Sequence, residues 1–214
     1  MVDQDTTAVA RGMRTQLTRR REALSSGASP VGWKIGFNTP AIQQVFGLSQ
    51  PVVGHLLDTG VREDGATVAI GDWTAPAVEV EVAIRVGLDG GVAGLAPALE
   101  LVDLDISFDD IEPVLATNIC QRGVIFGDEV LDVDPWAMVA TVRKEGNEVG
   151  EGRIVEDPGD TVAFVRSFLD AHGALLEPGD RIIAGSVVAP VAVAPGDELR
   201  VDFGPLGALH VAFA

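Results

Sequence analysis

Residues 78–86 form the sequence VEVEVAIRV, whose strict alternation of apolar and polar side chains is the feature that most limits the possible fold. A period of two predicts a β-strand with one apolar face and a second face that carries Glu79, Glu81 and Arg85. Positions two apart on a strand lie roughly 7 Å apart at Cα, so the two carboxylates repel each other unless water or a cation lies between them. Taken alone, the pattern is typical of a strand face that points to solvent.

From about residue 50 onward the chain is predicted to be rich in β-strands. Gly, Pro and Asp interrupt short runs of Val, Ile and Ala there, as in ATVAIG and DELRVDF. One helix is predicted within this region, over residues 158–173, because its apolar side chains form a stripe and Gly173 ends it.

The N-terminal region is predicted to be mainly helical. Residues 6–25 carry apolar side chains at helical spacing, whereas residues 31–37 predict a strand. A short helix follows, with Thr39 as its N-cap and Gly47 beyond its end. Pro at the first helical position is typical of such a helix.

Length and composition fit one folded domain and limit its partners. The 214 residues are 47% hydrophobic, so we expect a single α+β domain over 1–214, with a helical part at 1–49 and a β-rich body at 50–214. The net charge of −17 repels phosphate groups, so we expect no nucleic-acid partner and no anionic membrane. No apolar run approaches the roughly 18 residues of a membrane span and no signal peptide is evident, which predicts a cytoplasmic protein. The single cysteine, Cys120, excludes an intrachain disulfide and a cysteine zinc site.

A third carboxylate changes the interpretation of the first two. Glu100 lies between two leucines in the nearly apolar segment GLAPALELVDLDI, so it either ends an element or is buried with a partner. Three carboxylates from two elements suit a hard cation that prefers oxygen ligands, magnesium or manganese rather than zinc. Asp103 could hold one of these ligands in place, although an exposed aspartate is the interpretation that we favour.

Lys34 raises a similar question in the segment VGWKIGF. Desolvating an ammonium costs several kcal/mol, so Lys34 either points out of a half-buried strand or is held in a pocket for a purpose. The segment alone does not decide between these alternatives.

Four segments, in their order along the chain, resemble a known family. VGWKIGFNTPAIQQVFGLSQP, VEVEVAI, PALELVD and IIAGSVVAPVAVAPGDELRVDFGPLGALHVAF are similar to the 2-keto-4-pentenoate hydratases of the fumarylacetoacetate hydrolase superfamily, which also includes 2-oxo acid decarboxylases. The resemblance covers about residue 8 to the end of the sequence. It implies a mixed β-roll that holds the metal, with an N-terminal helical segment, in a protein that is usually oligomeric.

The resemblance also implies a set of site residues. The Mg²⁺ or Mn²⁺ ligands would be Glu79, Glu81 and Glu100. Lys34 would lie at the substrate, beside an apolar wall made partly by Trp33 and Phe37, and the loop of Gly185 and Ser186 would contribute to the pocket. Lys34 could act as a general acid/base or as a charge clamp for a carboxylate, and the sequence does not separate these roles.

The activity that the resemblance implies is that of a divalent-metal-dependent lyase, a hydratase of a small 2-oxo acid such as 2-hydroxypenta-2,4-dienoate, in the catabolism of aromatic compounds. Alternatives within the superfamily are decarboxylation of a 2-oxo diacid and hydrolysis of an acylpyruvate C–C bond. A non-catalytic metal-binding partner subunit is the alternative from a different class. Lys34 together with three glutamates favours an enzyme.

Several positions depart from the family pattern. Val52 stands where the family usually has an aspartate that helps to activate water, and this favours the non-catalytic alternative. His55, three residues on, could substitute for it, but a lone histidine is more often structural. Arg122 could bind the second carboxylate of a diacid, or it could be a surface arginine. The run ALHVAFA has no polar tail and predicts a covered strand, which together with the resemblance predicts a homo-oligomer.

Overall fold

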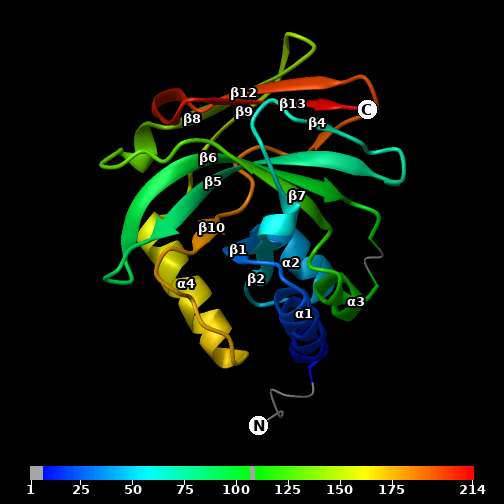
Figure 1. Cartoon of the computed structure of the whole chain (residues 1–214), viewed down its shortest axis with the longest axis vertical. Helices are drawn as coiled ribbons and strands as arrows, with labels where there is room; N and C mark the ends of the chain where they lie inside the picture. Colours follow the sequence, from blue (N-terminus) through cyan, green and yellow to red (C-terminus); the bar gives the residue numbers. More distant parts are fainter. Residues whose placement is uncertain (1–6, 107–108) are drawn as a thin grey trace.

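The computed structural model describes residues 7–106 and 109–214, whose strands form two sheets (Figure 1). In the described residues, the first sheet has eight strands: β2 (Val52–Leu57), β1 (Pro30–Gly36), β10 (Arg181–Ile183), β5 (Pro76–Val86), β6 (Val92–Asp103), β7 (Gln121–Phe126) and β3 (Val61–Arg62) in spatial order, with β11 (Val191–Ala192) paired to β5. The second sheet has five described strands in the order β4 (Thr67–Val68), β13 (Ala208–Phe213), β12 (Glu198–Asp202), β8 (Val139–Lys144) and β9 (Asn147–Arg153).

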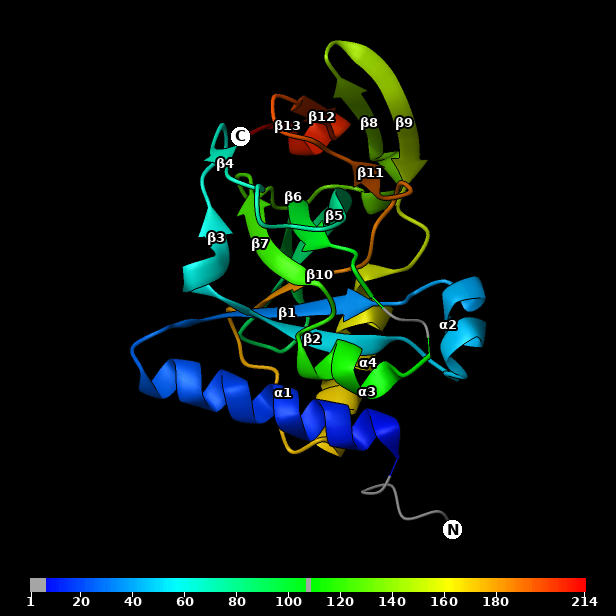
Figure 2. The same ribbon diagram turned by 90° about the vertical axis from the view of Figure 1, so that its right-hand side faces the viewer.

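Helices lie on the side of the first sheet away from the second sheet (Figure 1). The described α-helices are α1 (Ala8–Ser25), α2 (Pro40–Phe46), α3 (Ile111–Ala116) and α4 (Pro158–Ala171), and short 3₁₀ turns cover Asp58–Gly60, Pro135–Ala137 and Gly204–Leu206. Figure 2 shows α1 and α3 side by side, with β1 and β2 above them. None of the helices within residues 7–106 and 109–214 combines the length and the apolar character that a membrane crossing requires.

The residues that the sequence predicts at the ends of α2 lie at those ends in the structure. Pro40 begins α2, and Gly47 follows it in the left-handed conformation with φ 64°. Thr39 occupies the N-cap position, but its side chain makes no capping hydrogen bond. Asp157 caps α4 through hydrogen bonds from the backbone N–H groups of Gly159 and Asp160.

The alternating segment forms β5, in the centre of the first sheet. Its apolar face, from Val78 to Val86, is buried in the main hydrophobic core. β5 and β6 pair antiparallel, and Glu79 lies directly opposite Glu100 in their register. Residues of the second sheet and of α4 belong to the same core as this apolar face. The opposite face of β5, with Glu79 and Glu81, is directed toward Lys34 of β1, whose charge interacts with both carboxylates.

β1 joins segments that are far apart in sequence. Lys34 is opposite Gly54 of the antiparallel neighbour β2 and opposite Ile183 of the parallel neighbour β10. The loop after β10 therefore begins next to Lys34. The α+β class and the mixed, curved sheet agree with the predicted β-roll.

The strand ALHVAFA is covered by its own chain. As β13 it pairs with β12 on one side and with β4 on the other. The strand is covered, as expected, but by β4 and β12 of the same chain, so its covering does not itself require a second subunit. The homo-oligomer itself stays a prediction.

Candidate metal centre

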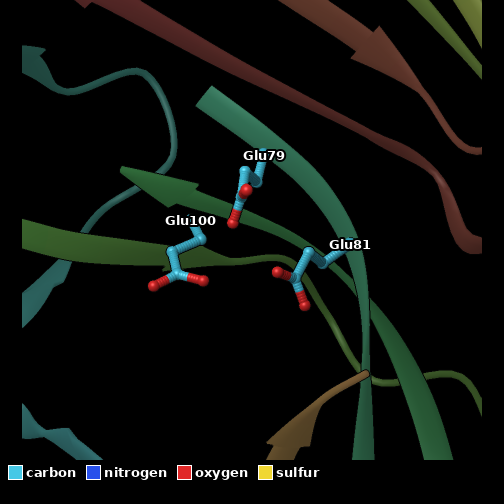
Figure 3. Close-up of side chains that lie close together, drawn as sticks. All are labelled: Glu79, Glu81 and Glu100. Atoms are coloured by element: carbon cyan, nitrogen blue, oxygen red, sulfur yellow. The ribbon is translucent and has the colours of Figure 1, made fainter. Parts of the chain in front are cut away.

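Three carboxylates from the β5–β6 hairpin converge in front of the first sheet (Figure 3). One oxygen each from Glu79, Glu81 and Glu100 lies within 4.8 Å of the other two. Glu79 and Glu81 share a strand face because of the period of two, and Glu100 joins them through the register of β6. The sequence pattern thus produces a compact cluster of oxygen atoms.

Two of the three carboxylates are fully buried and incompletely hydrogen-bonded. Glu81 and Glu100 have no solvent-exposed area. Glu81 Oε2 accepts a hydrogen bond of 2.8 Å from the backbone N–H of Gly185, but Glu81 Oε1 and Glu100 Oε2 have no hydrogen-bond partner among the described residues. Buried polar atoms are rarely left in this state, because the lost hydration costs about 1–3 kcal/mol for each atom.

The pKa values of the cluster report the cost of burying like charges. Burial raises the pKa of Glu81 well above its usual value, and the charges of Glu100 and Glu79 raise it further. Burial also raises the pKa of Glu79, and raises that of Glu100 to about 7 although Lys34 acts in the opposite direction. A cation between the three groups would relieve this repulsion.

Lys34 lies against the cluster rather than in solvent. The residue is only 1% exposed, and its ammonium donates to Glu100 Oε1 and to the carbonyl oxygen of Ile119, the latter at 3.0 Å. Burial acts to lower the pKa of Lys34, but the three carboxylates outweigh it and raise that pKa. Of the two alternatives for this residue, the structure supports the lysine held in a pocket.

The residues fit a hard divalent cation. Three carboxylates offer oxygen atoms of the kind that Mg²⁺ and Mn²⁺ prefer, and no sulfur or imidazole belongs to the cluster as described. The two buried oxygens without partners, one on Glu81 and one on Glu100, are the positions that a metal would satisfy.

A cavity of about 460 Å³ opens beside the cluster. Lys34 and Glu79 bring charge to it, and Lys34 is the only basic side chain in its described lining. The other lining residues are uncharged, and most of them are apolar or glycine: Ile35, Gly36, Phe37, Asn38, Thr39, Ile42, Val102, Leu104, Ile106, Ile119, Cys120, Gly185, Ser186, Val187, Val188, Ala189 and Pro190. Such a lining suits a small molecule with one polar end and an apolar chain.

The loop after β10 connects the cavity to the cluster, as expected for Gly185 and Ser186. Gly185 donates to Glu81, and Ser186 Oγ lies within hydrogen-bond distance of the backbone of Val80 and of Val188. Because both residues are tied to β5 or to the loop itself, the wall of the cavity is fixed relative to the carboxylates.

Trp33 does not form part of the cavity wall, so this expectation is wrong. Its indole N–H donates to Asp180 at 3.1 Å, and the guanidinium of Arg20 lies over its ring. Trp33 and Lys34 are neighbours on a strand, so their side chains point to opposite faces, and both faces of β1 are buried. Phe37 does line the cavity.

The region around Asp103 also differs from expectation. Asp103 is only 7% exposed, which corrects the preference for an exposed aspartate. It accepts hydrogen bonds from the backbone N–H groups of Thr74 and Ala75, and it pairs with Arg122 at 2.9 Å. The Arg122 side chain is 49% exposed and lies outside the cavity lining. We therefore do not propose that Arg122 contacts a carboxylate of the substrate.

Val52, which stands in place of the family's aspartate, and His55, its possible substitute, lie away from the cavity. Val52 is 1% exposed at the start of β2, and neither Val52 nor His55 belongs to the cavity lining. His55 is opposite Trp33 in the register, and burial lowers its pKa to about 4, with Arg20 and Lys34 acting in the same direction. These features are those of a structural histidine, which was the favoured interpretation.

Sequence reasoning missed the segment after α3. Ile119 contacts Lys34 through its carbonyl oxygen and lines the cavity together with Cys120. Asn38 and Thr39, which precede α2, also line the cavity. The segment TNICQ has no glycine and no periodic pattern, so nothing in it signals an unusual backbone.

Comparisons with known proteins identify relatives and a solved structure of similar fold. No protein-family model matches the chain. A 2-keto-4-pentenoate hydratase of Dechloromonas aromatica is 29% identical over 235 residues, covering 100% of this chain and 87% of the relative. A 4-oxalocrotonate decarboxylase of Pseudomonas putida is 29% identical over 219 residues, covering 92% and 82% of the two chains. The solved 4-oxalocrotonate decarboxylase of Pseudomonas putida G7, complexed with magnesium and adipate, superimposes with a TM-score of 0.87 at 24% identity, over 97% of this chain and 86% of the other.

Proposed function

Because the chain is homologous to the 2-keto-4-pentenoate hydratases and 4-oxalocrotonate decarboxylases of the fumarylacetoacetate hydrolase superfamily, we propose that it is a divalent-metal-dependent lyase that hydrates a small 2-oxo acid. A compound such as 2-hydroxypenta-2,4-dienoate, from the breakdown of aromatic molecules, fits this class. The observation that carries the proposal is the carboxylate cluster beside Lys34 at one wall of the cavity.

Glu79, Glu81 and Glu100 would hold Mg²⁺ or Mn²⁺. The bound cation would act as a Lewis acid toward the 2-oxo group and stabilise the negative charge that develops on it. Gly185 would keep Glu81 oriented through its N–H group. Ser186 would fix the loop that forms one wall of the cavity, and so hold the substrate in place beside the carboxylates.

Lys34 would act on the substrate itself, either by holding its carboxylate or by moving a proton at one of its carbons. The variants Lys34→Arg and Lys34→Met separate the two roles, because arginine keeps the positive charge but does not release its proton in the working pH range. A charge clamp predicts substantial turnover for Lys34→Arg, whereas a proton carrier predicts that this variant is as inactive as Lys34→Met.

The cavity favours a monocarboxylic substrate over the diacid of the decarboxylases. Lys34 is the only basic side chain in its described lining, and Arg122 lies outside it. A diacid would carry a second carboxylate into a mostly apolar space, at a cost of several kcal/mol without a partner. Decarboxylation of a 2-oxo diacid is therefore the second candidate, supported by the equal identity to a decarboxylase.

The test is turnover of a panel of 2-hydroxydienoates, 2-oxo diacids and acylpyruvates with added magnesium or manganese. Loss of the diene absorbance with formation of a hydroxylated 2-oxo acid supports the hydratase, and carbon dioxide release supports the second candidate. Binding of metal without turnover of any compound would favour a non-catalytic partner subunit instead. The homo-oligomer and the cytoplasmic location remain predictions, to be checked by sedimentation and by fractionation.

A further inference from the structure

The turn after α3 has a backbone conformation that residues with side chains rarely adopt. Asn118, Ile119 and Cys120 have φ values of 63°, 53° and 64° in succession. The left-handed conformation costs about 1–2 kcal/mol for each residue other than glycine, and a β-branched residue such as Ile119 tolerates it poorly. Such a run persists only where its surroundings hold it, and strain of this kind is concentrated at functional sites.

The side chain of Asn118 attaches this turn to β2. Asn118 Oδ1 accepts from the backbone N–H of His55 at 2.8 Å, and Asn118 Nδ2 donates to the carbonyl oxygen of His55 at 2.9 Å. β2 is at the edge of the first sheet, so these backbone groups are on the side that has no neighbouring strand in the described sheet order. One asparagine thus pairs with β2 as a short strand would.

Two glycines make the close approach possible. A Cβ atom on Gly36 would lie 2.8 Å from Ile119 Cγ2, and a Cβ atom on Gly54 would lie 2.8 Å from both Asn118 Oδ1 and Lys34 Cγ. Contacts this short are repulsive, so any larger residue at either position would displace the turn or the lysine stem. The missing side chains at Gly36 and Gly54 therefore leave the space on β1 and β2 that the turn and the stem of Lys34 occupy.

The turn determines where the Lys34 ammonium lies. Its middle residue, Ile119, directs its carbonyl oxygen at Lys34 Nζ, 3.0 Å away. An ammonium has three donor hydrogens, and in the described residues Glu100 and Ile119 accept two of them. The third is left for the cavity that Lys34 lines.

We propose that Asn118 is a positioning residue, which locks the left-handed turn onto β2 and thereby holds the Ile119 carbonyl where it fixes the Lys34 ammonium at the cavity wall. This inference rests on the proposed role of Lys34 in catalysis. Asn118 acts through Ile119 and Lys34 and does not itself line the cavity.

A double-mutant cycle tests the kinetic consequence. Asn118→Ala should lower kcat by about tenfold to a hundredfold, as expected when a reacting group is misplaced by a fraction of an ångström, with a smaller change in KM. In a Lys34→Met background the same change should cause no further loss of kcat, because the residue acts only through Lys34. Independent, additive losses, or an Asn118→Ala variant with the parent's kcat, would overturn the proposal.

Two further variants separate positioning from folding. Thr117→Ala is the matched control, since among the described residues the Thr117 hydroxyl donates to carbonyls of α3, away from Lys34, and it should keep the parent's kcat. Asn118→Gly accepts the left-handed backbone without strain but lacks the link to His55, so it should fold even if Asn118→Ala does not, and should still lose kcat. Full kcat in Asn118→Gly would contradict a positioning role for the side chain.

A readout without turnover keeps this test separate from the proposed function. The sequence has two lysines, Lys34 and Lys144, and reductive methylation with formaldehyde followed by mass spectrometry measures each of them. The folded Asn118→Gly variant should methylate Lys34 several-fold faster than the parent, with Lys144 unchanged. Equal Lys34 rates in parent and variant contradict the proposal, whereas a parent inactive on the whole substrate panel contradicts only the proposed function.

Discussion

Replacing Glu81 by glutamine should change the stability of the protein in opposite directions with and without metal. Glutamine keeps the shape of the side chain, and its amide oxygen can still accept from Gly185. The change removes one negative charge from a cluster in which carboxylate oxygens lie within 4.8 Å of one another. Without metal, less like-charge repulsion should make the variant more stable than the parent.

The size of the effect follows from the geometry. Two unit charges separated by 4.8 Å repel by about 3.5 kcal/mol at an effective dielectric constant near 20. Because 4.8 Å is the upper limit of these separations, each fully charged pair repels by at least this much. A buried carboxyl group that takes up a proton no longer repels its neighbours, so we expect the variant to gain about 1–2 kcal/mol. For a chain of this length, that raises the Tm by roughly 2–8 °C.

Adding magnesium should reverse the order of stability. At a hundred times its Kd a ligand stabilises the native state by about 2.7 kcal/mol, or roughly 5–10 °C in Tm for the parent. Glu81→Gln loses a charged ligand and should show little of this shift. The variant should therefore melt above the parent in EDTA and below it in magnesium.

Calorimetric scans in EDTA and in magnesium measure both quantities on the same samples. Glu148→Gln, an exposed residue of β9, makes the same change of charge outside the cluster and should behave as the parent in both buffers. A Glu81→Gln variant with the parent's full magnesium shift would show that Glu81 is not a ligand. A variant that melts below the parent in EDTA would refute the repulsion argument.

Three further changes test other parts of the site. Lys34→Met should leave the magnesium shift in place and lower turnover on the order of a hundredfold, measured on the best substrate of the panel; parent-like turnover would remove Lys34 from the mechanism. Gly185→Ala should lose most of the magnesium shift in Tm, because φ at Gly185 is 99° and a Cβ atom there would collide with Asn38, displacing the N–H group that orients Glu81. His55 has a pKa of about 4 in the folded state against 6.5 for the free side chain, so its neutral form stabilises the fold above pH 6.5, and this contribution is lost as the pH falls toward 4. Denaturant titrations should therefore show the parent losing up to about 3 kcal/mol of unfolding free energy relative to His55→Gln between pH 7 and pH 4; parallel pH profiles would contradict a buried, neutral His55.

The carboxylate cluster could be predicted because its signals are local. The period of two puts Glu79 and Glu81 on one face, and Glu100 is conspicuous as a single polar residue in an apolar run. Lys34 is conspicuous for the same reason. Their convergence depends on the register of β5 and β6, which the sequence does not specify, although the short turn between the two strands favours their pairing.

Other features could not be predicted because they depend on remote residues. Both faces of β1 are buried, so its sequence does not alternate between apolar and polar residues. Nothing in the sequence therefore indicates on which face of the strand Trp33 lies. The turn from Asn118 to Cys120 contains no glycine, and it fits only because Gly36 and Gly54, on strands far away in sequence, leave room for it. In the same way, Asp103 is buried because the N–H groups of an earlier loop bind it.

The pairing of β1 with β10 has a consequence for the order in which the site assembles during synthesis. Residue 34 leaves the ribosome long before residue 183, its partner in the parallel ladder. The β5–β6 hairpin needs only contacts that are close in sequence, so the three carboxylates can meet in a nascent chain that has not reached β10. The strand of Lys34 has both of its neighbours only after β10 has been synthesised, and the loop of Gly185 follows later still. Contacts of such long range make folding slow. A chaperone or a metal ion that binds the chain in this interval would therefore encounter the three carboxylates before Lys34 is in place beside them.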